Sequence, residues 1–221
     1  MLNAAVIGLG WWGRYILNSL SVSDKIKLTR AIDVNVDTAR DLIDKYDVIL
    51  SDDLQDTLDD DDIDFVILAT PHSMHEEQVI RVAEAGKHVF CEKPLCLNAA
   101  GAARAIEACE DASVQLGIGH ERRFEPAMLE IKRMVQAGEL GTIMHAESNF
   151  SHDKLASVPA GDWRTQAKDA PAAGMTAMGI HLTDAYINIL GPVDELYAQT
   201  AKRVLDWEHG DVIGVQLRMK S

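Results

Sequence analysis

Basic residues are scarce in this chain of 221 residues: 21 lysines and arginines stand against 35 aspartates and glutamates, giving a formal net charge of −14. Nucleic-acid binding needs clustered Lys and Arg, so the composition excludes that class of partner. We expect small-molecule substrates instead. Long apolar runs are also missing, which excludes a membrane-spanning helix. Because the first apolar strand begins within a few residues of Met1, we expect no signal peptide and a cytoplasmic protein.

Metal-binding and disulfide patterns are equally rare. The three cysteines are an odd number without paired metal spacing, and we predict small buried residues in a reducing compartment. His72 and His75 lie three apart, but no third or fourth ligand accompanies them at a useful spacing. The acidic run at 59–62 lacks the alternating ligands and central glycine of a calcium loop, so we interpret it as a solvated turn. We therefore expect no metal ion.

Alternating strand and helix patterns fill the first half of the chain, which is typical of a parallel sheet with crossover helices. The apolar run from Phe65 to Ala69 has the continuity of a strand buried on both faces. An α/β sheet of this kind binds ligands at the carboxyl ends of its strands. The predicted strands are 3–8, 26–33, 48–50, 64–69, 87–91 and 113–118, and the predicted helices are 12–20, 36–46, 74–85 and 98–110.

The pattern changes after residue 120, which predicts two domains with a boundary near Gly119. A nucleotide-binding domain at 1–120 precedes an α+β domain at 121–221 whose open sheet is mainly antiparallel. A sheet that ends at Lys220-Ser221 leaves an unpaired edge, so we interpret the chain as a fragment; the alternative is a partner that supplies the missing strands. The predicted elements of the second domain are helices at 126–137 and 174–190 and strands at 142–150, 193–204 and 211–219.

Three glycines, Gly8, Gly10 and Gly13, directly follow the first apolar strand. A dinucleotide-binding loop needs glycine for a tight turn, for backbone approach to a pyrophosphate and for close packing of the next helix. That helix, which begins near Trp12, offers its N-terminal amides to the phosphates, so Trp11 and Trp12 are candidate cofactor-binding residues. Loops match G-x-G-x-x-G by chance, but here a strand, a helix and an acidic residue twenty positions later accompany it. We predict a dinucleotide-binding Rossmann domain.

The acidic residue is Asp33, at the end of the second predicted strand. A carboxylate there accepts hydrogen bonds from both ribose hydroxyls and repels a 2′-phosphate. Arg30 and Arg40 are the nearby arginines in sequence, and neither directly follows Asp33. The alternative is a turn residue in Asp33-Val34-Asn35. We predict NAD as the cofactor and disfavour NADP.

Two candidate catalytic groups lie further along the chain. Lys93, in Glu92-Lys93-Pro94, follows the strand at 87–91, where burial and a cofactor charge would lower its pKa and suit it to polarise a substrate oxygen. The alternative is a surface lysine in a turn. His181 and Asp184 lie three apart on one predicted helix face and form a workable acid–base pair. The alternative is a hydrogen-bonded helix histidine beside an exposed aspartate.

Taken together, these residues resemble the glucose-fructose oxidoreductase, inositol dehydrogenase and rhizopine catabolism family, called Gfo/Idh/MocA. The resemblance covers essentially the whole chain. Glu92-Lys93-Pro94 matches its most diagnostic motif, and Gly8 to Gly13 matches its nucleotide loop. Further matches lie at Ala69-Thr70-Pro71 with His75, Arg123-Phe124 with Pro126, Trp163-Arg164, and Gly179-Ile180-His181 with Asp184.

The resemblance implies a two-domain oxidoreductase, a dimer or tetramer, that passes a hydride between nicotinamide and a carbon of a sugar, cyclitol or related polyol. In this scheme Lys93 polarises the oxygen and His181 removes the hydroxyl proton. The resemblance also implies cofactor contacts from Thr70, Pro71, His75, Glu92 and Lys93, and substrate contacts from His120, Arg123, Trp163 and Arg164. The last four also fit surface ion pairs and turns.

One departure concerns Ala177, because many family members carry an aspartate there, four residues before the histidine. The proton relay would then use Asp184, water or another substrate geometry, and we prefer Asp184. A short-chain dehydrogenase is excluded because no tyrosine is followed four residues later by lysine. The remaining alternative is a catalytically inactive nucleotide-binding regulator or scaffold of the same fold, against which Lys93 and His181 argue.

Overall fold

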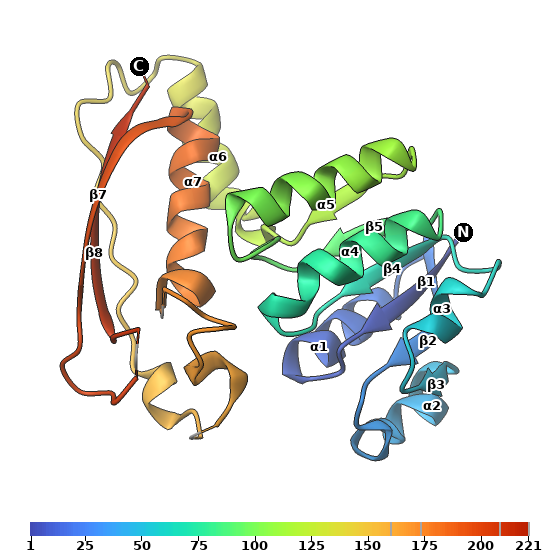
Figure 1. Cartoon of the computed structure of the whole chain (residues 1–221). Helices are drawn as coiled ribbons and strands as arrows, with labels where there is room; N and C mark the ends of the chain where they lie inside the picture. The colour runs from blue at the N-terminus through green and yellow to red at the C-terminus, as the bar shows by residue number, and fades with distance from the viewer. Residues whose placement is uncertain (160, 173, 208, 221) are drawn as a thin grey trace. The chain divides into compact units, whose positions relative to one another are not determined.

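The computed structural model describes residues 1–159, 161–172, 174–207 and 209–220 (Figure 1). The chain divides into two compact units, Met1–Gly119 and His120–Ser221, and each is described by itself. None of the described helices is long and apolar enough to cross a membrane. Ser221, at which the predicted sheet ends, lies outside the described residues.

A six-stranded parallel sheet forms the centre of the first unit (Figure 1). Its strands are β1 (Leu2–Ile7), β2 (Ile26–Ile32), β3 (Ile49–Ser51), β4 (Phe65–Leu68), β5 (His88–Cys91) and β6 (Leu116–Ile118). They lie in the order β3-β2-β1-β4-β5-β6, and every neighbouring pair is parallel. The two central strands, β1 and β4, are largely apolar and buried, as expected for strands covered on both faces.

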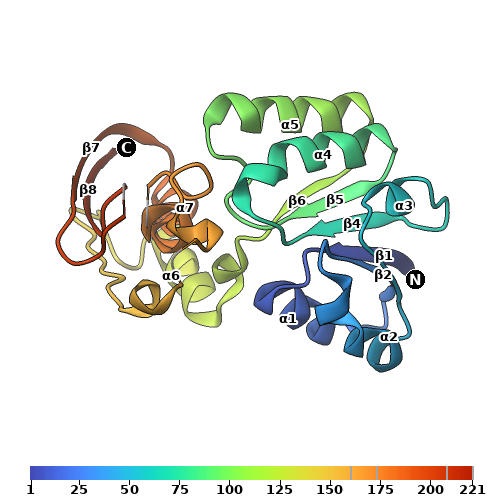
Figure 2. The ribbon, with the colours of Figure 1, turned by 60° about the horizontal axis from the view of Figure 1, so that its bottom comes forward.

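Helices cover both faces of this sheet (Figure 2). They are α1 (Trp11–Leu20), α2 (Asp41–Tyr46), α4 (His75–Glu84) and α5 (Ala99–Asp111). The helices α4 and α5 lie on one face, and α1 and α2 lie on the other. Each face has its own apolar core, with Val79 and Val82 buried in one and Leu17 and Leu42 in the other. The apolar sides of the amphipathic helices are therefore buried on both faces of the sheet.

The predicted parallel α/β fold is confirmed, with two local differences. The predicted helix at 36–46 is split into a 3-10 turn, η1 (Val36–Ala39), and α2. The Thr38 hydroxyl donates to the carbonyl oxygen of Asn35 at 2.9 Å, a local bond that competes with helix continuation. A one-turn helix, α3 (Gln55–Leu58), has no counterpart in the prediction, because so short an element carries no apolar repeat.

Two helices and a β-hairpin make up much of the second unit (Figure 1). The helices α6 (Pro126–Gln136) and α7 (Ile180–Leu190) are linked by a 2.7 Å hydrogen bond from Lys132 Nζ to Asn188 Oδ1. The strands β7 (Val193–Ala201) and β8 (Val212–Met219) pair antiparallel, which confirms the predicted antiparallel sheet. In β8 half-buried Ile213, Val215, Leu217 and Met219 alternate with exposed residues, as in a strand that covers a core with one face.

The strand predicted at 142–150 is wrong. These residues have no regular secondary structure, and in the described part of the chain they form no ladder with another strand. Met144 of this segment is 87% exposed. The segment contacts α7 through a 2.7 Å hydrogen bond from the Tyr186 hydroxyl to Ser148 Oγ. A segment forms a strand only where a neighbouring strand supplies the ladder hydrogen bonds. That condition depends on tertiary structure and is invisible in the local pattern.

Candidate functional site

The turn from β1 to α1 is packed so tightly that two of its glycines leave no room for a side chain. Gly8 has a φ of +91°, and a Cβ there would lie 2.7 Å from the carbonyl oxygen of Ala69. A Cβ on Gly13 would lie 1.8 Å from the carbonyl oxygen of Gly8. Gly10 differs, because among the described residues a Cβ there meets no atom within 4 Å. The backbone at Gly10 is therefore open to a ligand, as a pyrophosphate-binding turn requires.

The N-terminus of α1 lies at this open position. Gly10 is the N-cap, so no side chain caps the helix, and the first turn carries no acidic residue. The first amide N–H groups of this ten-residue helix are therefore suited to bind an anion. Trp11, Trp12 and Tyr15 stack beside them, with ring centroids 5.5 Å apart for Trp11 and Trp12 and 5.0 Å apart for Trp12 and Tyr15. Trp11 is 76% exposed, so its ring remains accessible.

Asp33 lies directly after β2, and its carboxylate is held from two sides. Oδ2 accepts a hydrogen bond from the amide of Leu9 at 2.7 Å, and Oδ1 accepts one from the amide of Asn35 at 2.9 Å. The first bond ties the carboxylate to the glycine loop itself. Each carboxylate oxygen keeps lone-pair capacity for a further donor. This arrangement fits a ribose whose hydroxyls donate to the carboxylate.

A further arginine, absent from the site predicted from the sequence, lies next to the glycine loop. Arg14, which directly follows the last glycine of the loop, donates to Asp41 through two hydrogen bonds of 2.9 and 3.1 Å. These bonds raise the pKa of Arg14, and the charge of Asp33 contributes in the same direction. The position of Arg14 directly after Gly13 is the feature of the sequence that points to it. The two arginines considered there, Arg30 and Arg40, pair with Asp60 at 2.6 Å and Asp37 at 2.8 Å.

His75, the first residue of α4, joins the loops that follow β4 and β5. Its side chain is fully buried, with Nδ1 2.7 Å from the carbonyl oxygen of Pro94 and Nε2 3.0 Å from that of Thr70. Thr70 is held further by a 2.5 Å hydrogen bond from its hydroxyl to Gln78 Oε1. His75 therefore fixes the spacing of two strand-end loops, and the second of these carries Lys93.

Glu92 and Lys93 directly follow β5 at the carboxyl edge of the sheet. The buried carboxylate of Glu92 packs against Gly119, where a Cβ would lie 2.5 Å from Oε1. Glu92 Oε2 also accepts a hydrogen bond from the amide of Lys93 at 3.3 Å. The side chain of Lys93 is half-buried. These contacts hold the lysine at the edge where doubly wound sheets bind their ligands.

The burial of His75 predicts a pH-dependent stability. Desolvation outweighs the two carbonyl contacts and lowers the pKa of His75 below its ordinary value of 6.5. The unfolded chain therefore binds this proton more tightly than the folded protein, so stability is present above pH 6.5 and is lost as the pH falls below it. We expect a slope of at most about 1.4 kcal/mol per pH unit from this one proton.

Denaturant titrations between pH 7 and pH 5 check this expectation. The pH slope should shrink in His75→Gln, whose amide still donates to one carbonyl, and should persist in His145→Gln, which changes an exposed histidine. An unchanged slope in His75→Gln would show that His75 does not take up the proton on unfolding.

In the second unit, His181 and Asp184 are both buried residues of α7, 6% and 8% exposed. Arg123 of the turn η3 (Glu121–Phe124) donates from Nε to Asp184 Oδ2 at 2.8 Å and from Nη2 to Oδ1 at 2.5 Å. His120 Nδ1 lies 3.7 Å from the same Oδ1. The structure thus gathers His120, Arg123 and Asp184 into one cluster. Both carboxylate oxygens of Asp184 accept hydrogen bonds from Arg123.

The turn before α7 is a π-helix, η6 (Met175–Gly179). Ala177 lies within this widened turn. It occupies the position at which the resemblance leads us to expect an aspartate. Thr176 is buried, and its hydroxyl oxygen accepts a hydrogen bond from the amide of Ala172 at 3.0 Å. Single π turns are frequent at functional sites. This one leads directly into the helix that carries His181.

Trp163 and Arg164 form a local unit in the turn η5 (Trp163–Thr165). The guanidinium carbon of Arg164 lies 4.2 Å from the centroid of the Trp163 ring. Asp162 caps the turn by accepting the amide of Arg164 at 2.8 Å, and its carboxylate also accepts from Arg164 Nη1 at 3.3 Å. The Arg164 side chain is 42% exposed. The guanidinium is therefore oriented and still accessible to a ligand.

The acidic run at 59–62 is part of a structural turn. Asp60 pairs with Arg30, which lowers the pKa of the Asp60 carboxyl. The buried Lys87 Nζ donates to the carbonyl oxygens of Asp60 and Ile63 at 2.7 and 3.2 Å. Within the described ranges, no group of three or more His, Cys, Asp or Glu side chains is placed to hold a metal ion. The cysteines are free, and burial raises the pKa of the thiols of Cys91, Cys96 and Cys109.

Comparison with known families gives a match for each unit. Residues 2–120 match the model described as an oxidoreductase family with an NAD-binding Rossmann fold, GFO_IDH_MocA. The chain belongs to the GFO/IDH/MocA oxidoreductase family. Residues 128–221 match the model of a GFO/IDH/MocA C-terminal domain. The resemblance read from the motifs is thereby confirmed, as is the order of a nucleotide-binding part followed by a second domain.

Individual proteins of this family are similar over part or all of the chain. The scyllo-inositol 2-dehydrogenase (NAD(+)) of Bacillus subtilis is 38% identical over 164 residues, which cover 69% of this chain and 45% of that protein. A crystal structure from Desulfitobacterium hafniense, assigned to the NADPH-dependent oxidoreductases, superposes with a TM-score of 0.92 at 26% identity and covers 99% of this chain and 63% of that one.

The WlbA dehydrogenase from Bordetella pertussis, solved in complex with NADH and UDP-GlcNAcA, superposes with a TM-score of 0.86 at 25% identity. The match covers 99% of this chain and 64% of that one. The chain spans about half the length of the curated relatives that it matches first. Family membership is therefore established for the chain.

Proposed function

We propose that the chain is an NAD-dependent oxidoreductase that passes a hydride between nicotinamide and a CH–OH carbon of a sugar, cyclitol or related polyol. The observation that carries the proposal is the open backbone at Gly10 next to the uncapped N-terminus of α1, with the Asp33 carboxylate bonded to the same loop. The scyllo-inositol dehydrogenase and the sugar-nucleotide complex of WlbA support the substrate class. A homo-oligomer is part of the same proposal.

The residues of the first unit fit a dinucleotide. The amides at the start of α1 would bind the pyrophosphate, and Asp33 would accept the ribose hydroxyls. Bound nicotinamide supplies a hydride acceptor at its C4 atom. Thr70, Pro71 and His75 order the end of β4, and Glu92 orders the end of β5, so that the backbone on either side of Lys93 is held in place.

We assign the acid–base roles to Lys93 and His181. The Lys93 ammonium would polarise the substrate oxygen, and the His181 imidazole would take the hydroxyl proton. Asp184, bonded to Arg123 through both oxygens, is better suited to position α7 than to accept that proton. His120, Arg123, Trp163 and Arg164 are proposed to contact the substrate, with the stacked Arg164 guanidinium as the most accessible donor among them.

A second candidate is a catalytically inactive nucleotide-binding regulator or scaffold of the same fold. Ala177 favours it, because the π turn before His181 carries a methyl group where a carboxylate would assist proton transfer. Such a protein would keep the glycine loop and Asp33 while losing turnover.

One screen separates the two candidates. The purified protein is incubated with NAD+ and a panel of sugars, cyclitols and sugar acids, and the absorbance of NADH is followed. Reduction with at least one polyol supports the oxidoreductase. Binding of NAD+ in calorimetry without reduction by any polyol supports the regulator. Failure to bind NAD+ contradicts both.

The preference for NAD gives a separate prediction for Asp33→Ala. The substitution removes two ribose hydrogen bonds and a charge that repels the 2′-phosphate. We therefore expect the NADP dissociation constant, divided by the NAD dissociation constant, to fall by about tenfold. Calorimetric titration with each cofactor measures the ratio. Asp44→Ala, an exposed acidic residue of α2, is the control for a change in net charge. A ratio that stays the same in Asp33→Ala would remove Asp33 from the ribose site.

A further inference from the structure

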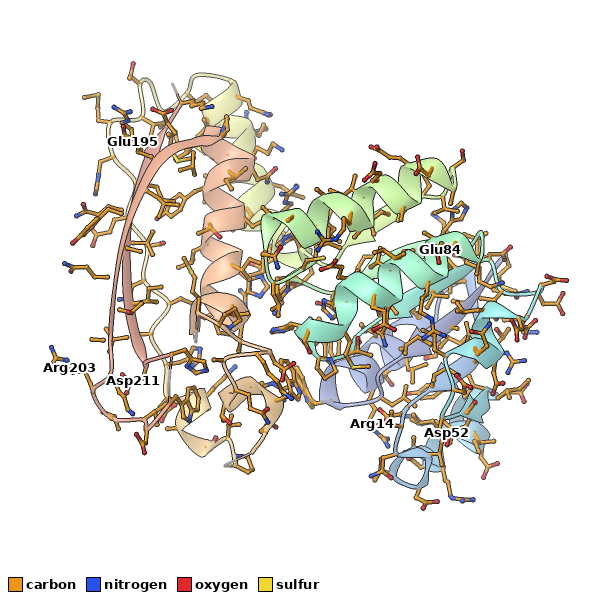
Figure 3. All side chains as sticks on the ribbon, in the orientation of Figure 1. Arg14, Asp52, Glu84, Glu195, Arg203 and Asp211 are labelled. Atoms are coloured by element: carbon orange, nitrogen blue, oxygen red, sulfur yellow. The ribbon has the colours of Figure 1, made fainter. Side chains whose placement is uncertain are left out.

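The ion pair between Arg14 and Asp41 ties α1 to the segment that follows Asp33. Arg14 Nη1 donates to Asp41 Oδ2 at 2.9 Å, and Nη2 donates to Oδ1 at 3.1 Å. Nη2 also donates to the carbonyl oxygen of Thr38 in η1. Figure 3 labels Arg14 on the side of α1 next to the segment that leads to α2. The guanidinium is therefore held by the loop that begins at the proposed ribose-binding residue.

The charges beside this loop disfavour the binding of a 2′-phosphate. Arg14 carries one positive charge, while Asp41 and Asp33 carry one negative charge each. The Asp33 carboxylate is fixed by the amides of Leu9 and Asn35, and its negative charge acts to raise the pKa of Arg14. A 2′-phosphate, with about 1.5 to 2 negative charges, would meet the fixed negative charge of Asp33, while the positive charge of Arg14 is already paired with Asp41.

We propose that Asp41 helps to select NAD over NADP by holding Arg14 in this ion pair, and that Arg14 released from Asp41 is a ligand for the 2′-phosphate. The proposal rests on the proposed dinucleotide-binding function and deepens it, because it assigns cofactor selectivity to a pair of residues besides Asp33. Planar guanidinium groups bind phosphate through paired N–H donors, and Arg14 sits next to the loop that would hold the same dinucleotide.

Because Arg14 is partly exposed and Asp41 is exposed, the Arg14 guanidinium can leave the carboxylate and bind a phosphate in its place. The side chains of Arg14 and Asp41 are 33% and 62% exposed, so neither is locked in the core. An exposed ion pair contributes little to stability, whereas a guanidinium–phosphate contact is a strong charge-assisted hydrogen bond. Removing the Asp41 charge should therefore change cofactor binding more than it changes folding.

The test is a double-mutant cycle on the chain, read out as dissociation constants for NAD+ and NADP+ by calorimetry. We expect Asp41→Asn to tighten NADP+ binding by about tenfold and to change NAD+ binding by less than about threefold. In an Arg14→Gln background, Asp41→Asn should have no effect on either cofactor. Asp41→Ser provides a second variant, and thermal unfolding verifies that each variant is folded.

The control variant is Asp37→Asn, which removes the same charge from the same loop. Asp37 pairs with Arg40, and both side chains are more than two-thirds exposed at 76% and 72%. We expect Asp37→Asn to leave the ratio of the two dissociation constants unchanged.

Two results would overturn the proposal while NAD+ binding is intact. An unchanged ratio in Asp41→Asn would mean that Arg14 does not reach the phosphate. An equal tightening of NADP+ binding with and without Arg14 would mean that Asp41 acts through its own charge. If the unsubstituted chain binds neither cofactor, the proposed dinucleotide-binding function fails, and this assignment fails with it.

Discussion

Replacing Gly13 by alanine is expected to destabilise the first unit by about 3 kcal/mol or more and to abolish cofactor binding. The new Cβ would lie 1.8 Å from the carbonyl oxygen of Gly8, a backbone atom that no rotamer change can move away. Relief of the contact requires α1 to shift off the sheet. That shift would open the core around Leu17 and displace the amides at the start of the helix. Thermal or denaturant unfolding measures the loss.

Gly10→Ala is the matched control, because it adds the same methyl group to the same loop. Gly10 has φ −64° and ψ −173°, which alanine adopts without strain, and its Cβ position is open among the described residues. We expect a loss of stability of about 1 kcal/mol, since alanine is a poorer N-cap than glycine. Cofactor binding should weaken nonetheless, because the methyl group would occupy space in front of the helix amides. Equal stability of Gly13→Ala and the unsubstituted chain would contradict the packing described for this turn.

Lys93→Met is expected to lower kcat by about 10²- to 10⁴-fold while the dissociation constant for NAD+ changes by less than about threefold. Methionine keeps most of the length of the lysine side chain but has no charge and no proton to donate. The backbone around it should stay in place, because Glu92 packs against Gly119 and the carbonyl of Pro94 contacts His75. The loss should therefore appear in turnover and leave cofactor binding intact.

Steady-state kinetics on any polyol found in the substrate screen, with calorimetry for NAD+, measures both quantities. Lys27→Met, an exposed lysine of β2, should retain the kinetics of the unsubstituted chain. A Lys93→Met variant with unchanged kcat would place the polarising group elsewhere. A variant that loses NAD+ binding and turnover together would indicate that the lysine supports the cofactor and not the substrate oxygen.

Much of the first unit follows from local patterns. The continuous apolar run Phe65–Leu68 predicts a strand buried on both faces, and the glycine spacing predicts the turn after β1 because only glycine tolerates those contacts. Contacts between segments distant in sequence do not follow in this way. The bond from Arg14 to Asp41 spans 27 residues, and the contact of His75 with Pro94 spans 19. Single-sequence spacing contains no signal for either partner.

In the second unit too, local elements can be predicted from the sequence, whereas contacts between distant segments cannot. The helix with Met128, Ile131 and Val135 is predictable from its amphipathic repeat, and the hairpin is predictable from alternation in residues such as Val215 and Leu217. A strand is also predicted at 142–150, yet these residues form none in the described part of the chain, because strand formation depends on an available neighbour. The candidate residue Asp184 illustrates the same limit, since its hydrogen bonds to Arg123 span 61 residues.

The strand order β3-β2-β1-β4-β5-β6 has a consequence for how the chain can assemble as it leaves the ribosome. Of these six strands, β1 is made first and is central; β2 and β3 then add in turn on one side, and β4, β5 and β6 add on the other. No later strand has to be inserted between two that are already paired. Each emerging strand therefore meets a free edge, and the growing sheet can complete itself before the second unit is translated.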